Sequence, residues 1–143
     1  MYKIMLLLHI LGAVGMGFYI ILPIMIGKAS KLAGAGQEGL ATGLLSANRI
    51  AQYFLILQLL TGGYLMTEAE YAVIWMIIVT LLFLGIAAIG GIITKPLKLI
   101  VTAVKSGQSA TAHINKARVL SFVVLGLYVV NIYFMVFRIY VEQ

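Results

Sequence analysis

The stretch Ala72 to Thr94, AVIWMIIVTLLFLGIAAIGGIIT, contains no Asp, Glu, Lys or Arg and decides the fold of this chain. Three more apolar runs are equally free of charge, at Ile4 to Ile26, Ile50 to Met66 and Val119 to Phe137. A helix rises about 1.5 Å per residue and the hydrocarbon core of a bilayer is about 30 Å thick, so each run predicts a membrane-crossing helix.

The predicted fold is all-α, because unpaired backbone groups are too costly in lipid for open strands to cross it. Residues 39–48 are mostly small and apolar, so the second helix is expected to begin before Arg49, which then snorkels towards the headgroups. We expect a single integral membrane domain, residues 1–143, built as an antiparallel four-helix bundle. Its spans are expected at about residues 4–26, 45–66, 72–94 and 119–137.

Composition agrees with a membrane domain. The chain is 63% hydrophobic with a mean hydropathy of +1.10, which leaves no room for a soluble catalytic domain. Cysteine is absent, so disulfides and thiolate-bound metals are excluded. The net charge of +6 comes from basic residues that flank apolar helices. Besides the bilayer itself, we therefore expect anionic lipid headgroups as partners and no nucleic acid.

The basic residues also predict an orientation. Most of them flank the first and third connections: Lys28, Lys31, Arg49, Lys95, Lys98, Lys105, Lys116 and Arg118. The opposite side has Lys3, Arg138 and an acidic tip at residues 67–70. By the positive-inside rule, both termini and the acidic tip face outward in a multi-pass protein of the cell membrane.

A cleaved signal peptide is a competing interpretation of the first span, since Lys3 precedes it and small residues follow at 33–35. The apolar run is too long for a signal peptide, and cleavage would place a lysine-bearing loop outside. That alternative would leave three helices.

The segment 95–118 has two interpretations. Its first half places Leu97, Ile100, Val101 and Val104 at helical spacing, which is typical of an amphipathic helix at the headgroups that docks lipid or a partner. The favoured interpretation is that the third helix continues past the membrane into the cytoplasm.

Few residues in this sequence can support chemistry. All four acidic residues, Glu38, Glu68, Glu70 and Glu142, lie at or beyond the predicted interfaces, so a carboxylate relay or a hydrolytic site is not expected. Apart from tyrosines, His9 is the only titratable group well inside a span. The chain is therefore expected not to be an enzyme, and His9 is the main candidate for a functional role.

His9 shares one helical face with Met5, Gly12 and Met16, at spacings of four, three and four. Imidazole and thioether groups suit haem iron or copper(I), and a small residue at Gly12 would let a flat porphyrin approach the backbone. The alternative is that the glycines only allow close helix packing while His9 hydrogen-bonds a neighbour.

A haem would need a second axial ligand. His113 is the only other histidine, and the topology places it across the bilayer from His9, so it is expected to be a solvated loop residue. The remaining candidates are a tyrosine, water, His9 of another subunit, or one of three methionines: Met16, Met76 and Met135. The buried amides Gln58 and Asn131 must also find partners, either each other or His9, and Asn131 is included in the expected cofactor site.

The opening Leu8, His9, Ile10, Leu11, Gly12, Ala13, Val14, followed by Gly15 and Gly17, resembles the first helix of a group of small bacterial membrane proteins. The group includes HemJ-type protoporphyrinogen oxidases, the membrane domain of CopD-type copper-resistance proteins and uncharacterised four-helix families. The ending, Asn131 to Arg138, is similar to the last helix of the uncharacterised families.

This resemblance implies a bacterial cytoplasmic membrane and b-type haem or copper bound through His9. HemJ-type enzymes are expected to have a basic or imidazole group in the third helix, and residues 72–94 have none, which argues against oxidase activity.

Two functional classes follow. The first is a cofactor-binding protein for electron transfer or for metal or haem handling, with His9, Gly12, Met16, Asn131 and Met135 around haem b, or His9 and Met5 on copper. The second is a structural or accessory subunit of a larger respiratory or transport complex, without a cofactor of its own. Its small-residue faces suit a homo-oligomer or a heteromeric assembly.

Overall fold

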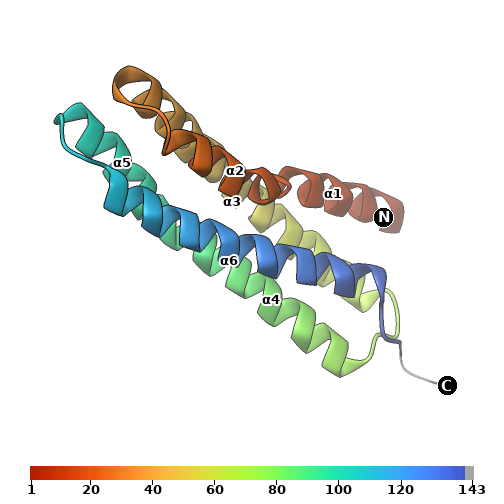
Figure 1. Ribbon diagram of the computed structural model, residues 1–143. Helices are drawn as coiled ribbons and strands as arrows, with labels where there is room; N and C mark the ends of the chain where they lie inside the picture. The colour runs from red at the N-terminus through yellow and green to blue at the C-terminus, as the bar shows by residue number, and fades with distance from the viewer. Residues whose placement is uncertain (141–143) are drawn as a thin grey trace.

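The structure, a computed structural model, describes residues 1–140 and is all-helical (Figure 1). The six helices are α1 (Tyr2–Gly15), α2 (Phe18–Ala29), α3 (Gly34–Thr67), α4 (Val73–Ile92), α5 (Thr94–Lys105) and α6 (Thr111–Val136). Four helical stretches are long and apolar enough to cross a membrane, with α1 and α2 forming one and α4 and α5 another. The expected all-α fold with four candidate spans is confirmed, as for a multi-pass membrane protein.

The helices extend beyond the apolar runs. The second stretch begins at Gly34 and the fourth at Thr111, well before the predicted spans, and the third continues to Lys105. Hydropathy marks the part of a helix that lipid can cover, whereas backbone hydrogen bonding continues through the small and polar residues beyond it. The helix ends are therefore poorly marked by the apolar pattern.

The first stretch is interrupted at Met16 and Gly17. The amide of Gly17 donates to the carbonyl of Val14 at 2.9 Å and that of Ile20 to Gly17 at 3.0 Å, which are the short-range bonds of a 3₁₀ turn. α1 then packs against α3, whereas α2 packs against α6 and α3. Figure 1 shows α1 diverging from the direction of α2 at this point.

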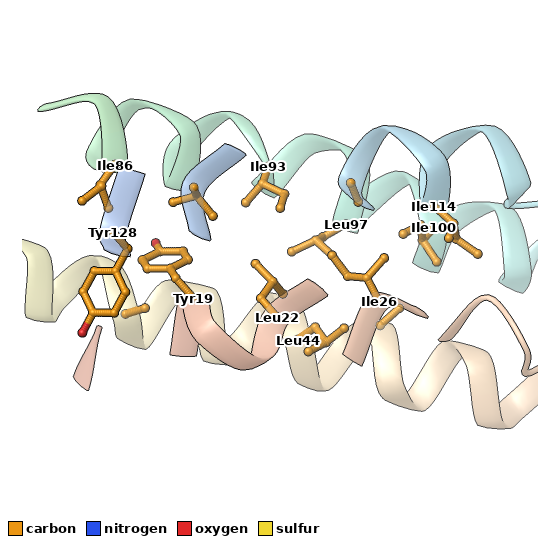
Figure 2. Close-up of a cluster of buried hydrophobic side chains, with 14 of the residues drawn as sticks. Tyr19, Leu22, Ile26, Leu44, Ile86, Ile93, Leu97, Ile100, Ile114 and Tyr128 are labelled. Atoms are coloured by element: carbon orange, nitrogen blue, oxygen red, sulfur yellow. The ribbon is translucent and has the colours of Figure 1, made fainter. Parts of the chain in front are cut away.

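The hydrophobic core lies among α2, α3, α5 and α6 and the second half of α4 (Figure 2). Leu22 and Ile26 of α2 face Ile93 and Leu97 across it, and all four are almost fully buried. The core continues to Ile114 near the start of α6. Most of α1 stays outside this core, because the break at Met16 and Gly17 turns it away.

A buried polar cluster joins α2, α3, α4 and α5 within the core. Asn48 donates from Nδ2 to the carbonyl of Gly90 at 2.9 Å and to Thr94 Oγ1 at 3.1 Å, and it accepts from Tyr19 Oη at 3.3 Å. Gln52 donates to the same Gly90 carbonyl at 3.1 Å. A side chain at Gly90 would collide with the Tyr19 hydroxyl, so glycine lets the helices approach here.

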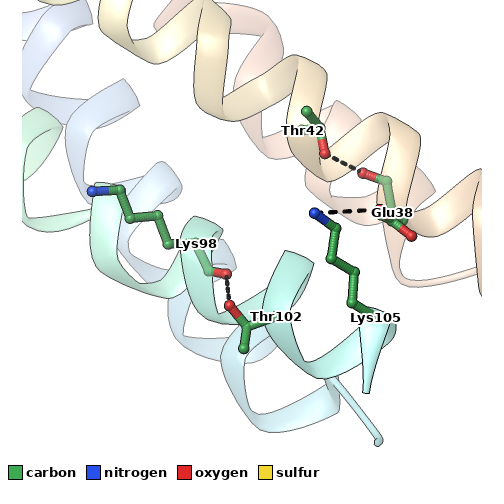
Figure 3. Close-up of polar contacts among 5 residues, drawn as sticks. All are labelled: Glu38, Thr42, Lys98, Thr102 and Lys105. Carbon is green, nitrogen blue, oxygen red and sulfur yellow. Dashed lines mark hydrogen bonds and ion pairs between the residues drawn. The ribbon is translucent and has the colours of Figure 1, made fainter. Parts of the chain in front are cut away.

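The lysine-bearing end of α5 packs against the start of α3 (Figure 3). Lys105 Nζ lies 3.8 Å from Glu38 Oε1, and Thr102 Oγ1 donates to the carbonyl of Lys98 at 3.1 Å. The apolar face of α5 is buried in the bundle, at Pro96, Leu97, Ile100 and Ala103. This face is therefore covered by protein, and α5 continues the third stretch after a break at Ile93.

Candidate ligand-binding pocket beside His9

The divergence of α1 from the bundle leaves a pocket of about 530 Å³ between α1 and α6, with α3 and the start of α4 as its other walls. We call it the α1–α6 pocket. Its wall combines aromatic, aliphatic and thioether side chains with a few polar ones, and it includes His9, Met16, Gln58, Tyr71, Trp75, Tyr128, Asn131, Met135 and Arg138. Ile10, Val14, Ile132 and Val136 also line it and are exposed on the bundle surface, so the pocket opens sideways. Both its volume and its largely apolar wall are typical of a small-molecule site.

His9 is held by two residues of α3. Its Nδ1 lies 3.0 Å from Thr61 Oγ1, and its Nε2 lies 3.1 Å from Gln58 Nε2. Gly62 permits this contact, because a Cβ there would lie 3.1 Å from His9 Cε1. The imidazole is therefore fixed against α3 and also lines the pocket.

The hydrogen bonds define the tautomer of His9. Thr61 Oγ1 donates its proton to the carbonyl of Leu57 at 2.8 Å, so it accepts from His9 Nδ1. Nε2 then carries the lone pair and accepts from the Gln58 amide. The ring is a neutral imidazole with both nitrogens occupied, and any ligand for Nε2 must displace Gln58.

Two residues that line the pocket each have an amide oxygen that is enclosed by protein and not open to the pocket. Gln58 Oε1 and Asn131 Oδ1 are buried and accept no hydrogen bond within residues 1–140. Their side chains are 8% and 6% exposed. Gln58 bonds His9, one of the partners expected from the sequence, while the Asn131 oxygen is left unpaired. Such groups are costly in an apolar surrounding.

Four of the residues predicted for a cofactor site line this pocket: His9, Met16, Asn131 and Met135. Gly12 does not line it, because its Cα packs against Gln58 Oε1 in the α1–α3 contact. Met5, the second predicted copper ligand, is not among the lining residues either.

His113 belongs to the first turn of α6, far along that helix from the pocket-lining Tyr128. Thr61, which fixes the His9 ring, was not predicted. Its signal in the sequence is its spacing of three from Gln58, which puts both on one face of α3.

One end of the pocket is closed by an aromatic cluster. Tyr71 stacks between Trp75 and Tyr140, with ring centroids 4.7 and 5.0 Å apart. Arg138 Nη1 donates to Tyr71 Oη at 3.3 Å, and Trp75 Nε1 donates to the carbonyl of Phe134 at 2.8 Å. Burial raises the pKa of the Tyr71 hydroxyl, so it is neutral at physiological pH. These contacts tie the 68–72 loop to the end of α6.

Comparison with known proteins adds no relative. No family model matches the chain, and neither a curated protein nor a solved structure matches it significantly. The fold and the pocket define a class, a small helical protein with four candidate membrane spans and a side-opening pocket.

Proposed function

We propose that this chain is an integral membrane protein that binds a lipid-soluble molecule in the α1–α6 pocket, with the His9 ring, held by Thr61 and Gln58, in its wall. The observation that carries the proposal is a ligand-sized, side-opening pocket with a largely apolar wall that includes a fixed imidazole. A purely structural bundle would be expected to fill such a space, because packing is the main force between helices in lipid.

The proposed topology is an antiparallel bundle in the bacterial cytoplasmic membrane with both termini outside. It rests on the lysines and arginines that flank the first and third connections. In this arrangement the pocket lies in the outer half of the membrane, and anionic headgroups bind the exposed lysines of the cytoplasmic side. A cysteine introduced at Ser106 should be labelled from the cytoplasm only. Labelling from outside would show that the orientation is the reverse of the proposed one.

Haem b is the cofactor that the resemblance implies, and some features of the pocket suit haem binding. Thr61 fixes the His9 ring through Nδ1, as a partner of a metal-binding histidine does, and Met16 and Met135 line the same pocket. The contact from Gln58 argues against haem binding, because its amide donates to the Nε2 lone pair that iron would need. Haem binding therefore requires Gln58 to rotate away. Copper(I) on His9 and Met5 requires the same rotation.

The two histidines provide a matched test for either metal. Protein purified in mild detergent and reduced with dithionite should show haem bands that vanish in His9→Ala and persist in His113→Ala. Metal analysis of the same samples addresses copper. Absence of both bands and copper in the wild-type protein would reject metal-based cofactors, while leaving the pocket itself untested.

The pocket is tested by closing it. Ile132 and Val129 are both exposed on α6, but only Ile132 lines the pocket. Mass spectrometry of the molecules that co-purify with the protein should show a species lost in Ile132→Trp and retained in Val129→Trp. Equal retention in both variants would contradict ligand binding in the pocket.

The alternative function is that of a structural or accessory subunit in a larger complex or a homo-oligomer. The observation that favours it is His9, whose two ring nitrogens are already satisfied within the chain. Close α1–α3 contacts at Gly15, where a Cβ would collide with Phe54, fit the same view. The mass of the particle extracted in mild detergent, measured by light scattering, should then exceed that of one chain with its detergent.

A further inference from the structure

The charge in the wall of the α1–α6 pocket is confined to one end. Arg138 is the one residue with a formal charge among the described residues, 1–140, that line the pocket. It follows the last turn of α6, while Tyr2, which also lines the pocket, begins α1 at the same end of the bundle (Figure 1). Tyr71 lies there too, because its hydroxyl accepts from Arg138 Nη1 at 3.3 Å. This end of the pocket therefore combines a cation with two phenols.

The rest of the pocket is long and apolar. Its lining on the first helical stretch runs from Tyr2 past Met16, a length of about 20 Å at about 1.5 Å per residue. The side that opens to lipid is bordered by exposed aliphatic side chains of α1 and α6: Ile10, Val14, Ile132 and Val136. A slot that is apolar along its length and charged at one end fits a single-chain amphiphile with an anionic head.

The guanidinium of Arg138 is held in place but keeps donors for a ligand. Its Nε donates to the carbonyl of Met135 at 3.0 Å, and its Nη1 donates to Tyr71. A guanidinium has five N–H groups, so these two bonds use only part of them. Within residues 1–140 the ion pair of the structure is that of Lys105 with Glu38, which joins α5 to α3. The planar guanidinium matches the two oxygens of a carboxylate.

We propose that the pocket binds a long-chain fatty acid as its carboxylate. The carboxylate pairs with Arg138, and the hydrocarbon chain lies in the slot between α1 and α6, towards Met16. One guanidinium balances one negative charge, and a volume of about 530 Å³ is that of a site for one small molecule, which favours one chain over a two-chain phospholipid. This inference rests on the proposed function and names the class of ligand for the same site. It concerns binding and assigns no reaction to the chain.

The position of Arg138 agrees with the way a fatty acid lies in a bilayer. A carboxylate stays at the interface, because an unpaired charge in hydrocarbon is costly. Arg138 lies just beyond the fourth apolar stretch, which ends at Val136, and is therefore at the level of the headgroups. Met16 lies deeper, within the first stretch. A fatty acid in the same leaflet therefore enters the pocket sideways without reversing its direction.

Trp75 provides the measurement, because it is the only tryptophan of the chain, lines the pocket and stacks on Tyr71 at the Arg138 end. Bromine quenches tryptophan emission at short range, so a brominated ligand reports contact. The full chain in nanodiscs of unbrominated zwitterionic lipid is titrated with stearic acid brominated near its carboxyl group, and with the methyl ester of that acid.

The acid is expected to reach half-quenching of Trp75 at about one fifth of the mole fraction that the ester needs, since an exposed ion pair contributes up to about 1 kcal/mol. Stearic acid brominated near its methyl end should quench less, because the proposed chain points away from Trp75.

Arg138→Gln is the variant that removes the cation. It should raise the half-quenching mole fraction of the acid about fivefold and leave that of the ester unchanged. Lys3→Gln is the matched control, because Lys3 is an exposed cation at the same end of the bundle that is not among the lining residues. Arg138→Lys keeps the charge and should keep the preference for the acid, which separates loss of charge from damage to the fold.

Several outcomes would overturn the inference. These are equal quenching by the acid and the ester, equal weakening by Arg138→Gln and Lys3→Gln, or displacement of the acid by a smaller mole fraction of unbrominated phosphatidylglycerol, which would identify a two-chain phospholipid instead. If the acid and the ester quench equally and Ile132→Trp still removes a co-purifying molecule, only the ligand class is wrong. If neither quenches Trp75 and nothing co-purifies, the proposed function fails with it.

Discussion

The same substitution, asparagine to leucine, is expected to change the free energy of unfolding differently at two buried positions. Asn48 and Asn131 are 0% and 6% exposed, and each lies in a helix that is long and apolar enough to cross a membrane. Asn48 makes three hydrogen bonds, to Gly90, Thr94 and Tyr19. Asn131 has an oxygen without a partner in residues 1–140. Leucine has the same branched shape as asparagine, so each replacement exchanges polar atoms for methyl groups but removes a different number of hydrogen bonds.

Asn48→Leu is expected to lower the free energy of unfolding by about 2 kcal/mol, since interhelical hydrogen bonds in membranes average about 0.6 kcal/mol each. The Gly90 carbonyl keeps its bond from Gln52, so the cost of an orphaned carbonyl is not added. Asn131→Leu should leave stability unchanged or raise it by about 1 kcal/mol, because it removes an unpaired buried group.

The assay is unfolding by SDS in mixed micelles, followed by helicity and by the emission of Trp75, which neither substitution touches. The wild-type protein and both variants are compared without added ligand. Asn115→Leu, the same change at an exposed position of α6, is the control. If Asn131→Leu lowered the free energy of unfolding as much as Asn48→Leu, Asn131 would be a residue that stabilises the contact between helices. Stability unchanged within about 0.5 kcal/mol at Asn48 would refute the hydrogen-bond argument itself.

Three further predictions use the same unfolding assay. Tyr128→Phe loses the 2.6 Å bond from the Tyr128 hydroxyl to the carbonyl of Ala13 and should cost about 1 kcal/mol, with wild-type stability as the contradicting result. Lys105→Gln should change stability by no more than about 0.5 kcal/mol, because its pair with Glu38 is solvent-exposed and screened by salt. Gly107→Ala should cost about 1 kcal/mol because Gly107 has a φ of 69°, and a neutral result would show that the α5–α6 turn relaxes.

The four candidate spans could be predicted from the sequence because lipid imposes a simple requirement on length and charge. The break at Met16 and Gly17 could not, since glycines in a membrane helix equally suit close packing, as at Gly15 against Phe54. Packing partners far along the chain decide which role a glycine takes. The position of α1, and with it the pocket, depends on that break.

The candidate site was predictable only in part, because spacing along one helix can be read from the sequence and contacts between helices cannot. Helical spacing placed His9 and Met16 on one face, and both line the pocket. It could not show that Gly12 faces Gln58, because the register between α1 and α3 is set by side-chain fit across the interface. The small residue predicted as a notch for a porphyrin in fact accommodates an amide oxygen.

Buried amide side chains at the two ends of the bundle differ in how fully they are hydrogen-bonded. Around Asn48, donors and acceptors are matched within the protein and the helices close upon them. Gln58 and Asn131 each keep one buried amide oxygen without a partner within residues 1–140. A leucine at position 131 would avoid this cost, whereas a leucine at position 58 would also remove the hydrogen bond to His9 Nε2. Asn131 is therefore the buried amide whose replacement should cost the least stability in the ligand-free protein, and Asn48 the one whose replacement should cost the most.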